Sequence, residues 1–134
     1  MVQQWICPFL IMTGLLIGCT HKDEAYFIRQ AERIKRELSS ELESIQTLGD
    51  LFIRQEGLTI RFEELAQLAI DSRQFQVKTK RCWELSDSER ESGKTLTREL
   101  QRVLTIAGAQ AVIEKCQLRA VEKIDSFEKR SGSY

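Results

Sequence analysis

The chain has 134 residues, with 20 Lys and Arg side chains balanced by 20 Asp and Glu side chains, one His and four Cys. This is the length of a single domain, which excludes a multidomain enzyme. Its 30% charged and 42% hydrophobic residues exclude a disordered chain or a multi-span membrane protein, and its zero net charge gives no electrostatic reason to expect nucleic acid as a partner.

The first 18 residues contain no Asp, Glu, Lys or Arg, so every charged side chain of this kind follows them. Residues 5–18 form an apolar run of 14, WICPFLIMTGLLIG. A membrane-spanning helix needs about 20 residues, whereas the apolar region of a signal peptide is of this shorter length. Polar residues begin directly after Cys19.

The residues at this boundary are Leu16-Ile17-Gly18-Cys19, and they resemble the lipobox of bacterial lipoproteins. The resemblance implies that the Cys19 thiol receives a diacylglyceryl group, that the Gly18–Cys19 bond is cut, and that the new N-terminus takes a fatty acid such as palmitate. Each buried CH₂ would add about 0.8 kcal/mol of membrane affinity. Thr20 follows the cysteine, where Asp would favour the inner membrane, so the outer membrane is weakly favoured if the cell has one.

The expected organisation is therefore a signal peptide over residues 1–18, a lipidated tether over 19–24, a helical domain over 25–130 and a frayed tail over 131–134. The alternative is an N-terminal apolar helix packed on the domain, with Cys19 an ordinary thiol. The mature chain lacks proline and is rich in Glu, Gln, Arg, Leu, Lys and Ala, which are good helix formers. The predicted fold class is all-α.

A 4-3 alternation of apolar residues from Phe27 to Phe52 predicts a first helix over about 23–56 that ends at Gly57. Thr59 is expected to cap a second helix over 59–85. A capping box at Ser86 and Glu89 predicts a third helix over 87–129. The third helix has two apolar stripes and is expected to be central. One stripe comprises Leu100, Leu104, Ala107, Ala111, Leu118 and Val121, and the other Val103, Ile106, Ile113, Ala120, Ile124 and Phe127.

These elements predict an elongated antiparallel three-helix bundle, or a helical hairpin with coiled-coil character, after the N-terminal signal helix. The alternative is an extended coiled coil that a second copy of the chain completes.

The sequence shows no pattern of a catalytic or metal site. Its only histidine, His21, lies in the proposed tether, and Gly93-Lys94-Thr95 lacks the glycine five residues earlier that a phosphate-binding loop requires. We therefore predict no catalytic residue, no metal and no cofactor.

The densest basic segment contains Lys78, Lys80 and Arg81 and lies beside Trp83. It is a candidate surface for lipid phosphates, an acidic glycan or an acidic partner. The alternative is a solvated helix end.

Cys82 and Cys116 are the two thiols that remain in the mature chain. They could form a disulfide, stay as buried free thiols or pair between molecules. In a straight antiparallel hairpin they would be offset by about 18 residues, or roughly 27 Å, which is beyond the reach of a disulfide. The intramolecular bridge therefore requires residues 76–92 to fold back.

These patterns lead to the expectation of a membrane-anchored bacterial lipoprotein of the cell envelope that is not an enzyme and acts as an interaction, assembly or structural subunit. Its partners would be the membrane, through the N-terminal lipid, and a protein or a second copy of the chain. The alternative is a ligand-binding or inhibitor module of the envelope. A small hydrolase would need converging buried polar groups.

Replacement of the lipobox cysteine tests the anchor. Cys19→Ala removes the thiol that accepts the lipid, so the variant should accumulate as an uncleaved precursor, measured as the intact mass of the membrane-extracted protein. Normal processing of this variant would refute the lipobox.

Overall fold

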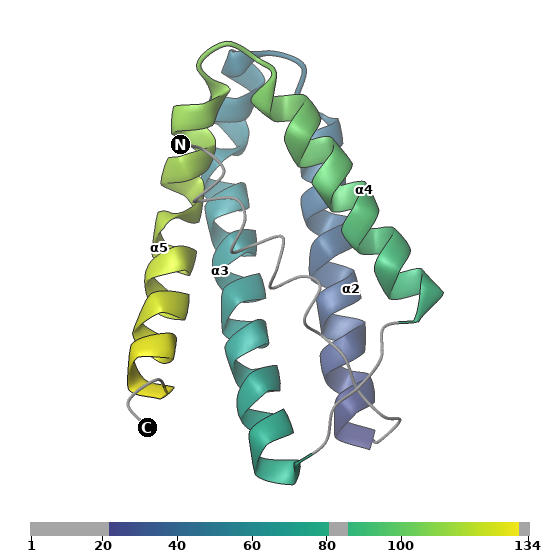
Figure 1. The fold of residues 1–134 in the computed structure, drawn as a ribbon. Helices are drawn as coiled ribbons and strands as arrows, with labels where there is room; N and C mark the ends of the chain where they lie inside the picture. Colours follow the sequence, from purple (N-terminus) through teal and green to yellow (C-terminus); the bar gives the residue numbers. More distant parts are fainter. Residues whose placement is uncertain (1–21, 81–85, 132–134) are drawn as a thin grey trace.

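The computed structural model describes residues 22–80 and 86–131, and its regular structure is entirely helical. Its four helices are α2 (Lys22–Glu43), α3 (Leu48–Thr79), α4 (Asp87–Leu104) and α5 (Ala109–Ser131), and they hold 90% of the described residues, with no strand. The pairs α2–α3 and α4–α5 form two hairpins whose turns lie at the same end of the molecule (Figure 1). The all-α prediction is confirmed, but the predicted set of three helices is not.

The predicted helix over 23–56 is in fact broken at residues 44–47. Thr47 has extended backbone angles, and its Oγ1 accepts a hydrogen bond from the Asp50 N–H at 3.1 Å. The Asp50 carboxylate accepts hydrogen bonds from the backbone N–H groups of Gln46 and Thr47, and these bonds lower the pKa of Asp50. This capping box begins a new helix because it satisfies N–H groups that have no partner within the helix.

The expected boundaries at Gly57 and Thr59 are also wrong, because α3 continues through both residues. The Thr59 hydroxyl donates to the carbonyl of Gln55 at 2.8 Å, one turn earlier, and therefore does not cap a helix. The helix ends at Thr79, where Lys80 adopts the left-handed conformation.

The capping box predicted at the start of α4 is confirmed. The Glu89 N–H donates to Ser86 Oγ at 3.3 Å, and the Ser86 N–H donates to Glu89 Oε2 at 2.7 Å. The predicted helix over 87–129, however, is interrupted at residues 105–108, where Gly108 has φ +84°. A Cβ atom at Gly108 would lie 3.2 Å from Leu48 Cδ2, so this turn sits directly on the start of α3.

The third predicted helix is not central. α4 packs on α2 and α5 packs on α3, so α2 and α3 form the inner pair. α4 leans away from α5, and the two come together only near their turn (Figure 1).

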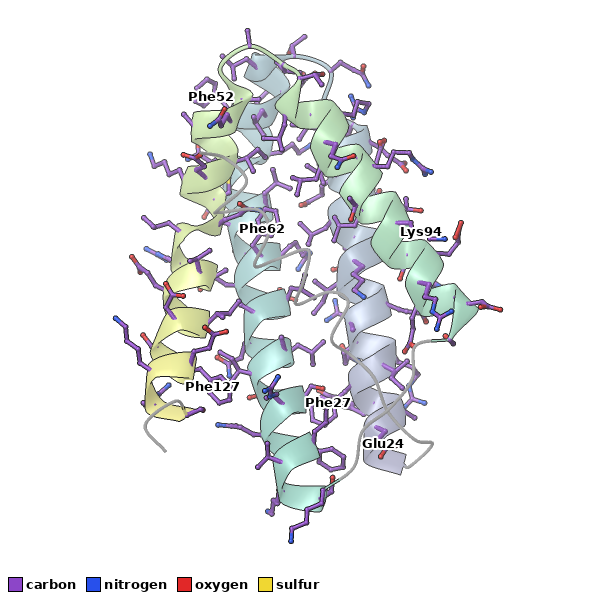
Figure 2. All side chains as sticks on the ribbon, in the orientation of Figure 1. Glu24, Phe27, Phe52, Phe62, Lys94 and Phe127 are labelled. Atoms are coloured by element: carbon purple, nitrogen blue, oxygen red, sulfur yellow. The ribbon has the colours of Figure 1, made fainter. Side chains whose placement is uncertain are left out.

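The two hairpins place buried residues at equivalent positions 62 residues apart, which fits the common direction of α2 with α4 and of α3 with α5. Phe62 of α3 lies near the middle of the bundle (Figure 2). The matched buried pairs are Ile34 and Leu96, Leu38 and Leu100, Leu51 and Ile113, Leu58 and Ala120, and Phe62 and Ile124.

Four charged side chains connect α2 to α3 in a closed ring of ion pairs. Arg61 lies 3.1 Å from Glu37 and 2.9 Å from Glu64, and Arg33 lies 3.1 Å from Glu37 and 3.7 Å from Glu64. The ring is partly exposed, so we expect it to set the register of the two helices more than their stability.

Arg102 of α4 holds the C-terminal end of α2. Its guanidinium donates to the carbonyl of Leu42 at 2.7 Å and to that of Ile45 at 2.9 Å, while Glu99 lies 3.3 Å from its Nε. The last turn of α2 contains no basic residue of its own. Arg102 therefore supplies both the donors and the positive charge that this helix end lacks.

Loss of this contact should destabilise the whole fold. Arg102→Met should lower the free energy of unfolding in urea by about 2 kcal/mol, since two charge-assisted hydrogen bonds to partly buried carbonyls disappear. Arg102→Lys should lose less, because one ammonium keeps the charge but cannot reproduce the two-pronged contact. The matched control is Arg98→Met at an exposed position one turn earlier. Equal stability of Arg102→Met and Arg98→Met would contradict this role.

Candidate functional site

The predicted basic surface is only partly within the described residues. Lys78 and Lys80 are exposed at the C-terminal end of α3. Arg81, Cys82 and Trp83 lie outside the described residues, as do Gly18, Cys19 and His21. The binding role of the basic segment therefore stays a prediction.

A groove between the outer faces of α3 and α5 gathers three of the large exposed apolar side chains of the described residues. We call it the distal groove, because it lies near the hairpin turns, where Figure 2 labels Phe52, and away from the first turn of α2, where it labels Glu24. Its volume is about 580 Å³. It is lined by Phe52, Ile53, Gln55, Glu56, Thr59, Lys115, Leu118 and Arg119.

Three large apolar side chains of the distal groove face solvent: Ile53 is 81% exposed, Phe52 56% and Leu118 42%. The groove also carries both signs of charge, with Glu56 on α3 and Lys115 and Arg119 on α5. Arg119 also lies 3.6 Å from Glu63, which joins the two walls. The site is therefore an apolar surface with charges that could orient a partner.

Cys116 lies behind this groove as a buried free thiol. Its Sγ donates to the carbonyl of Gln55 at 3.5 Å, and it also interacts with the side chain of Thr59. Burial is the main influence on this thiol and raises its pKa. The thiol is therefore held protonated and is a poor nucleophile.

The fold limits the predicted pairing of Cys116 with Cys82. Cys116 contacts Gln55, and α3 continues for about 24 residues beyond it, or about 36 Å, to Thr79. The three residues from Thr79 to Cys82 can reach back only about 11 Å, whereas a disulfide needs Cα atoms within about 7 Å. This geometry disfavours the bridge within one chain, and the burial of Cys116 disfavours a bridge between molecules, so the free thiol is the alternative that fits best.

A second groove, of about 570 Å³, lies between α2 and α4, and we call it the polar groove because its walls are built from polar and charged residues. Its lining combines hydroxyl groups with charges: Arg36, Ser39, Ser40, Glu43, Asp87, Ser88, Glu91, Ser92 and Thr95. Ser39 is buried, and its hydroxyl has no hydrogen-bond partner.

The same interface holds the buried ammonium group of Lys35. Burial lowers its pKa, while the carboxylates of Glu89 and Glu32 act in the opposite direction. Glu89 is itself buried, and Glu32 accepts a hydrogen bond from Ser88. These charges tie α4 to α2 and border the polar groove.

Sequence reasoning missed the distal groove because it assigned Phe52 and Leu118 to apolar stripes of the core. Both side chains continue the spacing of buried residues but face outward. The described residues contain no cluster of His, Cys, Asp and Glu suited to a metal ion. None of the described helices combines the length and the apolar character needed to cross a membrane.

Comparison with protein-family models, with curated proteins and with solved structures found no significant match to this chain.

The environment of Cys116 predicts a pH dependence. Its folded-state pKa is raised, so its contribution to stability is present below the ordinary thiol pKa of about 8.5 and is lost as the pH rises above that value. The free energy of unfolding should therefore fall more steeply between about pH 8 and pH 10 in the native protein than in Cys116→Ser, whose hydroxyl does not titrate there. Parallel curves would contradict this assignment.

Proposed function

We propose that this chain is a lipoprotein of the bacterial cell envelope, anchored through lipid on Cys19, and that its helical bundle is a non-enzymatic interaction subunit. The anchor is supported by the charge-free leader and by the residues Leu16-Ile17-Gly18-Cys19. The distal groove supports the interaction role and is the single observation that carries it.

Exposure of Phe52, Ile53 and Leu118 in one groove favours a protein partner. Single exposed apolar residues are common, but several gathered in a groove are typical of an interaction surface. Full burial of each such side chain contributes about 1.5–3 kcal/mol, so three are enough to support specific binding. A partner with its own apolar anchor and charges that complement Glu56, Lys115 and Arg119 would fit.

The position of the groove is compatible with this role. α2 spans 22 residues, or about 33 Å, from its first residue to the hairpin turns. A tether at Cys19 would precede the opposite end of α2 from the distal groove. The groove would then be presented away from the membrane, with the bundle acting as a spacer.

A ligand-binding or inhibitor module is the second candidate, and the polar groove between α2 and α4 favours it. Its hydroxyl groups and mixed charges suit a small polar ligand better than a lipid. The unpartnered hydroxyl of Ser39 would gain a hydrogen bond from such a ligand. The distal groove is the stronger observation, because its exposed apolar surface gains from being covered.

Site-specific photocrosslinking in the native membrane tests the interaction role. A photoreactive amino acid at position 53 should give a protein adduct, and Leu118→Glu should reduce the yield at least about tenfold, because it places a charge in the apolar contact. The matched control is the photoreactive residue at exposed position 101 of α4. An adduct of twice the chain mass would identify a second copy as the partner.

Equal adduct yields at positions 53 and 101, or yields unaffected by Leu118→Glu, would refute the distal groove as the partner surface. Saturable binding of a small polar ligand that Ser39→Val abolishes would favour the second candidate.

A further inference from the structure

The end of the bundle opposite the distal groove combines exposed cations with exposed apolar and aromatic side chains. We call it the proximal tip and define it as residues 24–30 of α2 and 73–80 of α3. The two segments lie side by side, because the rings of Phe27 and Phe75 are 5.4 Å apart between centroids. We propose that the proximal tip binds the surface of an anionic lipid bilayer, an inference that rests on the proposed lipid anchor and extends it.

Charge is the first observation behind this proposal. The proximal tip has four exposed cations, Arg29, Arg73, Lys78 and Lys80, and its only carboxylate is that of Glu24, which is buried. The complete chain has zero net charge, so charge is segregated along the bundle. Each cation close to an anionic membrane raises the binding constant by about fivefold.

The nearest exposed carboxylates of the described side chains lie farther up the bundle. Asp71 is nine residues before Lys80 in the same helix, or about 14 Å. Asp87 begins α4, and its neighbour Ser88 contacts Glu32 of α2, more than two turns above Lys22. Asp71 is also two residues before Arg73, at the inner edge of the proximal tip, so it is the outermost cations Lys78 and Lys80 that stand clear of exposed carboxylates.

Apolar and aromatic groups lie among these cations. Val77 is 68% exposed and Tyr26 53%. The Tyr26 ring meets that of Phe27 edge to face at 5.5 Å, which continues the contact with Phe75. Aromatic side chains with a polar edge, next to Lys and Arg, are the combination that settles at the interface between headgroups and acyl chains.

The length of the tether brings the same end of the bundle to the membrane. Lys22, the first residue of α2, is three residue steps from Cys19, and each step spans at most about 3.5 Å. A lipid on Cys19 therefore keeps the start of α2 within about 11 Å of the lipidated residue. The positive charge, the exposed apolar groups and the short tether together favour a bilayer over a soluble acidic partner as what the proximal tip binds.

Lysine acylation in vesicles tests this orientation. The complete, membrane-extracted protein is placed in vesicles of phosphatidylcholine, or of phosphatidylcholine and phosphatidylglycerol at three to one, and treated with an uncharged reagent that acylates lysine from the aqueous side. Peptide mass spectrometry gives the rate at each lysine. Lys78 and Lys80 should react at least about threefold more slowly in the anionic vesicles, while exposed Lys94 and Lys115 should keep their rates.

Paired variants separate membrane contact from other causes. Arg29→Gln with Arg73→Gln should restore the rates of Lys78 and Lys80 toward those in phosphatidylcholine, whereas the matched distal pair, Arg54→Gln with Arg98→Gln, should not. Equal rates in both lipids would overturn the proposal, as would protection by a soluble anionic polymer without vesicles.

The intact mass of the same sample reports the lipid on Cys19. A sample without that lipid refutes the anchor, yet slowed Lys78 and Lys80 in anionic vesicles would still uphold the proximal tip as a lipid-binding surface.

Discussion

The fold depends on the hydrogen bonds that the backbone carbonyl groups at the C-terminal end of α2 receive. This end has no basic residue in its last turn, and its carbonyl groups receive donors from Arg102, about 60 residues farther along the chain. The same contact fixes where α4 crosses α2, and the turn after α4 then places Gly108 against Leu48. With α4 fixed, α5 lies along α3 and forms the second wall of the distal groove. The hydrogen bonds that satisfy the end of α2 thus also help to place the distal groove between α3 and α5.

Helical content could be predicted from the sequence, but the turns could not be placed by periodicity. Ile45 and Leu48 continue the apolar spacing of α2 across the break, because both still point inward although the chain reverses there. The local signal was the capping pair Thr47 and Asp50, of the same kind as Ser86 and Glu89, which were recognised. Gly108 lies inside the predicted helix over 87–129, whereas its positive φ closes the turn that follows Leu104 and leads into α5.

Of the two candidate surfaces, the basic segment could be predicted from the sequence and the distal groove could not. Lys78 and Lys80 are visible as a basic segment in the sequence, and their exposure is what such a segment leads one to expect. Phe52 and Leu118 could not be identified as surface residues, since apolar residues at helical spacing usually face a core. Their exposure arises because α4 covers α2 and leaves the outer faces of α3 and α5 open, which is a property of the packing of all four helices.

The splayed arrangement of α4 and α5 also has a consequence for the order of folding. These two helices share little interface with each other, whereas α2 and α3 pack together and are linked by the ring of Arg33, Glu37, Arg61 and Glu64. Contacts between the hairpins close loops of about 60 residues, which is slow compared with forming a helical hairpin. We therefore expect the N-terminal hairpin to form first and to act as the surface on which the C-terminal half becomes ordered, since during synthesis it is complete before the residues that pack on it have emerged.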